Sequence, residues 1–206
     1  MFQVTAGGRN YALKLYRLKR HPDTAVLNAV KNTPRGNGLL IDLYDFGIWT
    51  SPTTGNSYDY ELMPYYQGGS LADVRPLRND KDGREKLKKI AIRMATEIAY
   101  CHERRVLHRD IKPANFLYDG TDKMNFVLTD FGIGKMIGND GMAIIDVGRT
   151  PIYAAPEMYT QIPGRPLSVT PAADFYSMGM ALMALWMGES VLTADEGKLV
   201  KDKQLM

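Results

Sequence analysis

Side chains of the kind that handle phosphate and metal ions gather in three short motifs of this chain. Carboxylate and amide oxygens such as those of Asp130 and Asn115 suit a hard cation like Mg²⁺. A lysine such as Lys112 carries a compact positive charge that suits a phosphate group. These residue types favour phosphoryl-transfer chemistry. The motifs are His108-Arg109-Asp110-Ile111-Lys112-Pro113-Ala114-Asn115, Asp130-Phe131-Gly132 and Gly148-Arg149-Thr150-Pro151-Ile152-Tyr153-Ala154-Ala155-Pro156-Glu157.

A further lysine lies upstream of these motifs, in the strand-like segment Tyr11-Ala12-Leu13-Lys14. Each feature alone is common by chance, and an isolated Asp or Lys usually forms only a surface ion pair. All four in this order resemble the signature of the eukaryotic-type Ser/Thr protein kinase family, from Phe2 to about Gly188. The resemblance implies a transferase that moves the γ-phosphate of ATP, with the help of Mg²⁺, to a hydroxyl of a protein substrate.

The resemblance implies a role for each reactive side chain. Asp110 would accept or orient the proton of the substrate hydroxyl, and Lys112 would place its charge on the transferring phosphate. Thr150 would form a hydrogen bond with both of them. Asn115 and Asp130 would be the metal ligands.

The same resemblance implies a nucleotide site. Lys14 would grip the α- and β-phosphates, and it would pair with Asp23, which stands where the family has a glutamate on a helix. Beside Pro22, Asp23 is nearly as well explained as a helix cap. The adenine would lie among residues that plain core packing would also explain: Ala12, Leu117, Phe2, the gatekeeper Met63, and the hinge residues Pro64 and Tyr66.

Further residues would support or regulate the site. Asp174 begins an apolar helix, where a carboxylate is costly unless it accepts N–H bonds, so we expect it to brace the catalytic loop. Arg109 would receive a negative charge from the activation loop. Asp146 would supply that charge permanently, although a solvated loop aspartate is an equal alternative. The supporting set is completed by His108, Phe131, Gly132 and Glu157.

The elements that must position these residues begin with strands. Alternating side chains predict a β-hairpin from Phe2–Val4 and Tyr11–Tyr16, with Gly7-Gly8 as its turn. Two more strands are expected over residues 39–43 and 58–63, joined across a polar turn.

Helices dominate the later part of the chain. After a short helix over residues 23–30, apolar residues at helical spacing predict a helix over 87–101, and a more uniformly apolar helix follows over 173–187. We therefore expect an α+β, protein-kinase-like bilobal fold. Its small antiparallel β N-lobe would occupy residues 1–67 and its mainly helical C-lobe residues 68–206, both incomplete relative to the family.

The sequence departs from the family in three respects. The glycine-rich loop expected before Phe2 is missing, the helix after Lys14 is short, and the last C-lobe helices are missing. Glu157 then lacks its usual arginine, so we expect it to be solvated, paired with another cation, or protonated. A partner or a homodimer would cover the apolar surface of an incomplete C-lobe.

These departures leave alternatives to an active kinase open. One is a pseudokinase or kinase-like regulatory binding module with little or no catalysis. Another is a phosphotransferase that acts on a small molecule, which the segment Ala155-Pro156-Glu157 disfavours because related small-molecule kinases usually lack it.

Composition excludes several other classes of protein. Twenty-six Lys plus Arg against 23 Asp plus Glu give a net charge of +3, too small an excess for a dedicated nucleic-acid or membrane-surface binder. The single cysteine, Cys101, excludes an internal disulfide framework and suits a reducing compartment. Met1–Thr5 lacks a secretory-signal pattern, and the most apolar stretch, Phe175–Met187, is too short to span a bilayer. We therefore expect a cytoplasmic protein.

Overall fold

The structure is a computed structural model, and it describes residues 1–18, 20–74, 76–118, 125–145, 150–159 and 167–188. Among these residues, no helix combines the length and the hydropathy that crossing a membrane requires.

The first part of the chain folds into a four-stranded antiparallel sheet with the strand order β1-β2-β4-β3. The expected hairpin is confirmed: its turn residues Gly7 and Gly8 have φ angles of 56° and 73°, a conformation that glycine adopts without a steric penalty. The four strands are β1 (Phe2–Ala6), β2 (Arg9–Leu15), β3 (Asp45–Thr50) and β4 (Ser57–Pro64).

The strand expected over residues 39–43 is wrong, because the strand lies at β3 instead. Leu40, Ile41 and Leu43 are buried, each at 4% exposure or less, whereas Leu39 and Asp42 are half-buried. The segment lies outside the four-stranded sheet and runs beside strand β7 (Phe126–Leu128). The Ile41 N–H donates a hydrogen bond to the Leu128 carbonyl at 2.9 Å. A short, mostly apolar run has the composition of a strand but does not need a place in the main sheet.

The short helix predicted after the hairpin is confirmed as α1 (Thr24–Lys31). Asp23 is its N-cap, and the side chain accepts a hydrogen bond from the Ala25 N–H at 3.0 Å. The buried face of α1 consists of Val26, Leu27 and Val30.

Two long helices dominate the remainder, as predicted: α2 (Lys81–Glu103) and α3 (Ala172–Met187). They pack against each other, and Ile90, Met94 and Ile98 of α2 are completely buried. Short strands β5 (Val106–Leu107), β6 (Phe116–Tyr118), β8 (Lys135–Met136), β9 (Ala143–Ile144) and β10 (Ser168–Val169) form antiparallel pairs β5–β8, β6–β7 and β9–β10. Single 3₁₀ turns occur at η1 (Leu71–Asp73), η2 (Pro113–Asn115) and η3 (Pro156–Met158).

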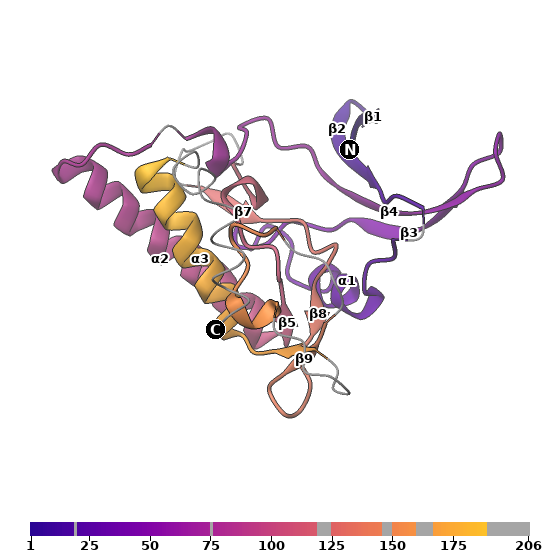
Figure 1. Ribbon diagram of the computed structural model, residues 1–206. Helices are drawn as coiled ribbons and strands as arrows, with labels where there is room; N and C mark the ends of the chain where they lie inside the picture. Colours follow the sequence, from indigo (N-terminus) through magenta and orange to yellow (C-terminus); the bar gives the residue numbers. More distant parts are fainter. Residues whose placement is uncertain (19, 75, 119–124, 146–149, 160–166, 189–206) are drawn as a thin grey trace.

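One hydrophobic core connects the sheet to the helices. It includes Ala12 and Met63 from the sheet, Val26 from α1, Leu128 from β7 and Met94 from α2. Figure 1 shows the sheet at one side of the molecule, α2 and α3 at the other, and α1 below the sheet. This is the expected α+β arrangement of a small antiparallel sheet followed by a mainly helical part. A boundary between residues 67 and 68 stays a prediction.

Candidate active site

A buried carboxylate at the start of α3 holds the loop between β5 and β6. Asp174 is fully buried, and its two oxygens accept the backbone N–H groups of His108 and Arg109, both at 2.8 Å. A third hydrogen bond at 2.9 Å joins Asp174 to His102 Nε2. The φ angle of Arg109 is 70°, in the left-handed region that costs a residue with a Cβ about 1–2 kcal/mol. Asp174 therefore fixes a strained turn directly before Asp110. This agrees with the expectation that a carboxylate at the start of an apolar helix accepts N–H bonds from this loop.

The three predicted catalytic side chains meet at this turn. Lys112 Nζ lies 2.6 Å from Asp110 Oδ2, and Thr150 Oγ1 donates to Asp110 Oδ1 at 2.6 Å. Lys112 also donates to Thr150 Oγ1 at 3.1 Å. The Asn115 amide closes the loop from its other end by donating to the Asp110 carbonyl at 2.7 Å and to Asp110 Oδ2 at 3.1 Å. These hydrogen bonds fix the Asp110 side chain in one orientation, with the positively charged Lys112 side chain beside it.

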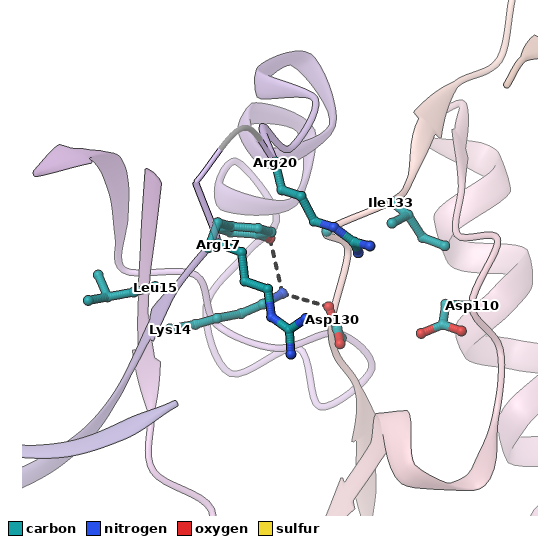
Figure 2. A pocket seen from close by; sticks show the side chains of 9 residues that line it. Lys14, Leu15, Arg17, Arg20, Asp110, Asp130 and Ile133 are labelled. Carbon is teal, nitrogen blue, oxygen red and sulfur yellow. Dashed lines mark hydrogen bonds and ion pairs between the residues drawn. The ribbon is translucent and has the colours of Figure 1, made fainter. Parts of the chain in front are cut away.

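A second carboxylate faces the first across the site. Lys14 Nζ, from strand β2, lies 2.6 Å from Asp130 Oδ1 although 116 positions separate the two residues (Figure 2). Burial opposes ionisation of Asp130, but the charge of Lys14 and its hydrogen bond outweigh burial and hold the pKa of Asp130 below its usual value. Asp130 is therefore an anion at neutral pH, and its side chain keeps 40% of its surface exposed toward the pocket.

The expected ion pair between Lys14 and Asp23 is wrong. Helix α1 begins only after Asp23, so one Asp23 oxygen caps the helix and the other lies 3.9 Å from Lys135 Nζ. Lys14 instead donates to the Tyr16 hydroxyl at 3.0 Å, and Tyr16 donates to Glu61 Oε1. Lys14 Nζ lies 3.8 Å from the same Glu61 oxygen.

The sequence prediction missed Glu61 and Tyr16, although one signal was present. Side chains alternate along a strand, so Glu61 must share the sheet face of Met63, which was expected to face the nucleotide. Lys14 and Glu61 are register partners in β2 and β4. Glu61 is 2% exposed; burial raises its pKa, and the charge of Lys14 and the Tyr16 hydrogen bond only partly oppose that rise. Burial likewise raises the pKa of Tyr16.

The residues expected around an adenine are only partly brought together. Ala12 and Met63 are register partners, and both are buried on the sheet face of Lys14. Phe2 pairs with Leu13, which points to the opposite face, and it is 57% exposed, so its expected place beside the adenine is wrong. Pro64 ends β4, Tyr66 packs half-buried against the main core, and Leu117 is half-buried in β6.

The supporting residues around Asp130 are tightly packed. The His108 ring lies 4.8 Å from the buried ring of Phe131, and its Nε2 lies 2.9 Å from the Thr129 carbonyl oxygen. A Cβ on Gly132 would come within 2.8 Å of the Tyr16 hydroxyl and 3.0 Å of Lys14 Nζ, so only glycine fits there without displacing Lys14.

The predictions for the regulatory residues Arg109, Asp146 and Glu157 compare differently with the structure. The buried Arg109 side chain donates from Nη1 to the Ile133 carbonyl at 2.9 Å, directly after the Asp130-Phe131-Gly132 motif. Asp146, its expected partner, lies outside the described residues. Glu157 is exposed in η3, which agrees with the first of the three states expected for it, a solvated carboxylate.

The predicted metal ligands have the chemistry that Mg²⁺ requires. Thr129 N–H donates to the Asn115 carbonyl at 2.9 Å, which places Asp130 next to Asn115. Because the Asn115 NH₂ group donates to Asp110, its side-chain oxygen is the atom that can face a cation, and Asp130 keeps the oxygen that Lys14 does not bind. One carboxylate and one amide oxygen fit a hard cation that also takes phosphate oxygens and water.

A pocket of about 410 Å³ opens between these groups (Figure 2). Lys14 and Asp130 form one wall and Asp110 stands opposite. Its lining consists of Lys14, Leu15, Tyr16, Arg17, Arg20, Asp110, Asp130, Gly132 and Ile133. The pocket joins both predicted carboxylates to one solvent-accessible space, as a phosphoryl-transfer site requires.

Comparison with known proteins agrees with this geometry. The sequence model of the protein kinase domain matches residues 40–206. The SNF1-like protein kinase ssp2 of Schizosaccharomyces pombe is 33% identical over 152 residues, 72% of this chain and 23% of that protein. The serine/threonine-protein kinase PknK of Mycobacterium bovis is 33% identical over 139 residues, 68% of this chain and 12% of that protein.

The chain thus spans less than a quarter of the length of these two relatives. The matched region contains Asp110, Lys112, Asn115, Asp130 and Thr150. With the family model covering most of the sequence, the chain belongs to the protein kinase domain family.

Proposed function

We propose that this chain is a Ser/Thr protein kinase that transfers the γ-phosphate of ATP to a protein hydroxyl with the help of Mg²⁺. The observation that carries the proposal is that the Lys14–Asp130 ion pair and Asp110 line one pocket, with Lys112 paired to Asp110 beside it. Phosphoryl transfer needs a held metal, positioned cations and an oriented acceptor hydroxyl, and these pairs supply groups for each.

Asp110 is the residue that orients the acceptor hydroxyl of the protein substrate. Thr150 and Asn115 hold its carboxylate and its carbonyl, so its position is set before a substrate arrives. It accepts a hydrogen bond from the acceptor hydroxyl and takes the proton as the bond from the acceptor oxygen to the γ-phosphorus forms and the bond from that phosphorus to the β,γ-bridging oxygen breaks, which releases ADP. Lys112, hydrogen-bonded to both Asp110 and Thr150, places its charge on the phosphoryl group in transit.

Asp130 and Asn115 would hold Mg²⁺, which would neutralise charge on the phosphates of the nucleotide. Lys14 is held by Tyr16, Glu61 and Asp130, and it binds the α- and β-phosphates. Ala12, Met63 and Leu117 contribute apolar walls for the adenine, and Pro64 and Tyr66 form the hinge.

A pseudokinase or binding module is the second candidate, because helix α1 contributes no carboxylate to Lys14 in this structure. For either function we propose a cytoplasmic location. We also propose a protein partner. For an active kinase this is the protein substrate, and for either function a partner protein or a second copy of the chain would cover the C-lobe. The Thr150–Asp110 hydrogen bond supports a Ser/Thr acceptor.

Transfer of radiolabelled phosphate from ATP to a generic protein substrate tests the proposal. We expect transfer that requires Mg²⁺ and is abolished in Asp110→Asn. The control Asp82→Asn changes an exposed aspartate in the first turn of α2 and keeps full activity. Binding of ATP without any transfer would favour the binding module.

A further inference from the structure

Two arginines from the segment between β2 and α1 line the pocket beside the carboxylates. Arg17 and Arg20 are both exposed, and both belong to the lining that also contains Asp110 and Ile133. Figure 2 shows Arg17 in front of Lys14 and Asp130, and Arg20 extending from its loop toward Ile133, on the wall across from Asp110. Their guanidinium groups therefore lie on a solvent-exposed side of the pocket, which we call its mouth, and share that pocket with Asp110.

These two arginines carry the uncompensated charge of the pocket. Lys14 pairs with Asp130 and Lys112 pairs with Asp110, each at 2.6 Å, so those charges cancel within the protein. Among the residues that the structure describes, Arg17 and Arg20 have no carboxylate within ion-pair distance. The unliganded pocket therefore has an excess positive charge at its mouth.

A nucleoside triphosphate with the one Mg²⁺ that Asp130 and Asn115 would hold keeps a net charge of about −2, so the nucleotide and an acidic substrate are both candidate counter-charges for the arginines. Arg17 and Arg20 line the same pocket as Asp110, the residue that receives the substrate hydroxyl, and this placement favours the substrate. The binding test below separates the two ligands.

We propose that Arg17 and Arg20 form a specificity site for an acidic group of the protein substrate, next to the acceptor residue. The inference rests on the kinase function proposed above and names its substrate class. Arginine presents a planar arrangement of N–H donors that matches carboxylate and phosphate oxygens, and both guanidinium groups line the pocket that contains Asp110. The positive mouth also attracts acidic peptides before contact.

Peptide binding tests the inference without requiring catalysis. Three peptides share one sequence around a serine and differ at the flanking positions, which carry glutamine, glutamate or phosphoserine. Their affinities are measured by fluorescence anisotropy with Mg²⁺ and a non-hydrolysable ATP analogue present. We expect the native chain to bind the two acidic peptides about tenfold more tightly than the neutral one, and the ratio of glutamate to phosphoserine binding identifies the anion preferred.

Variants assign the preference to the two arginines. The double variant Arg17→Gln/Arg20→Gln should bind all three peptides with nearly equal affinity. Arg9→Gln is the matched control, because it removes the same charge from an exposed arginine at the start of β2, outside the pocket lining. It should keep the tenfold preference.

Two results would overturn the inference. One is a native chain that binds no peptide, or binds all three equally. The other is a double variant that keeps the preference for acidic peptides but loses affinity for the ATP analogue, which would assign the arginines to the nucleotide instead. Preferential binding of acidic peptides without phosphate transfer would support the acidic site while removing the proposed kinase activity, so the two claims fail separately.

Discussion

Lys14 and Glu61 are direct partners across strands β2 and β4, and the lysine nitrogen lies 3.8 Å from a carboxylate that is almost completely buried. The pair belongs to the sheet, so it forms wherever the two strands are in register. Helix α1 takes no part in it, because Asp23 is occupied as the N-cap. The position of Lys14 is therefore set by strand pairing rather than by the placement of a helix.

The first prediction concerns Glu61→Gln, which keeps the size of the side chain and removes its charge. Lys14 then loses an anchor and pairs with Asp130 alone, so we expect MgATP to bind about threefold to tenfold more weakly. Isothermal titration calorimetry measures the change.

Asp23→Asn is the matched control for Glu61. Asparagine caps a helix as well as aspartate does, so this variant removes the charge while keeping α1 in place. We expect unchanged affinity for MgATP. A loss as large as that of Glu61→Gln would show that Asp23 is the partner of Lys14 after all.

The second prediction concerns Gly132→Ala. The added Cβ would lie 2.8 Å from the Tyr16 hydroxyl and 3.0 Å from Lys14 Nζ, so Lys14 must move away from Asp130. We expect nucleotide affinity to fall with little loss of stability, because Tyr16 and Lys14 can shift toward the open pocket. Gly179→Ala in α3 is the control, since nothing lies within 4 Å of its Cβ and alanine favours a helix by about 1 kcal/mol. Equal affinities in the two variants would contradict this packing argument.

The third prediction concerns Asp174→Asn. An amide can still accept one backbone N–H, but its own NH₂ group then faces the other donor, so one of the bonds to His108 and Arg109 is lost. We expect the free energy of unfolding to fall by about 2–3 kcal/mol in urea denaturation. The control Asp80→Asn changes the exposed N-cap of α2 to another good cap and should leave stability within about 0.5 kcal/mol. Equal urea-denaturation midpoints for Asp174→Asn and Asp80→Asn would contradict the role of Asp174.

Motifs with fixed local spacing were predicted from the sequence. Asp110, Lys112 and Asn115 lie in one short loop, so their mutual contacts follow from a few backbone turns. Asp174 was predicted for a different reason: a carboxylate in an apolar helix must find donors. Both arguments need little knowledge of how distant segments pack.

Contacts that depend on strand register or on an exact helix start were not predicted. The Lys14 partner changed from Asp23 to Glu61 because α1 begins after Asp23 and because β2 pairs with β4 in one particular register. The segment 39–43 was misassigned because a short apolar run does not by itself distinguish a strand of the main sheet from a buried irregular segment. Arg17 and Arg20 lie in an irregular segment, whose sequence carries no periodic signal for the direction of a side chain.

The last prediction concerns pH and the buried Glu97 of α2. It is completely buried; Arg93 binds one of its oxygens at 2.8 Å, and the other oxygen has no hydrogen-bond partner in the described part of the chain. Burial raises the pKa of Glu97 well above its usual value, because the charge of Arg93 and its hydrogen bond only partly oppose the effect. The folded state therefore binds this proton more tightly than the unfolded state does.

Since the folded state retains the proton of Glu97, stability should fall as pH rises from the usual glutamate pKa through the raised one. Glu97→Gln replaces the carboxyl by a neutral group of the same shape, so it should remove this decline. Urea denaturation at intervals from about pH 4.5 to pH 8 gives the two slopes, and the native chain should lose more stability over this range than the variant. Parallel curves would mean that Glu97 is ionised in the folded chain throughout, with Arg93 compensating fully for its burial.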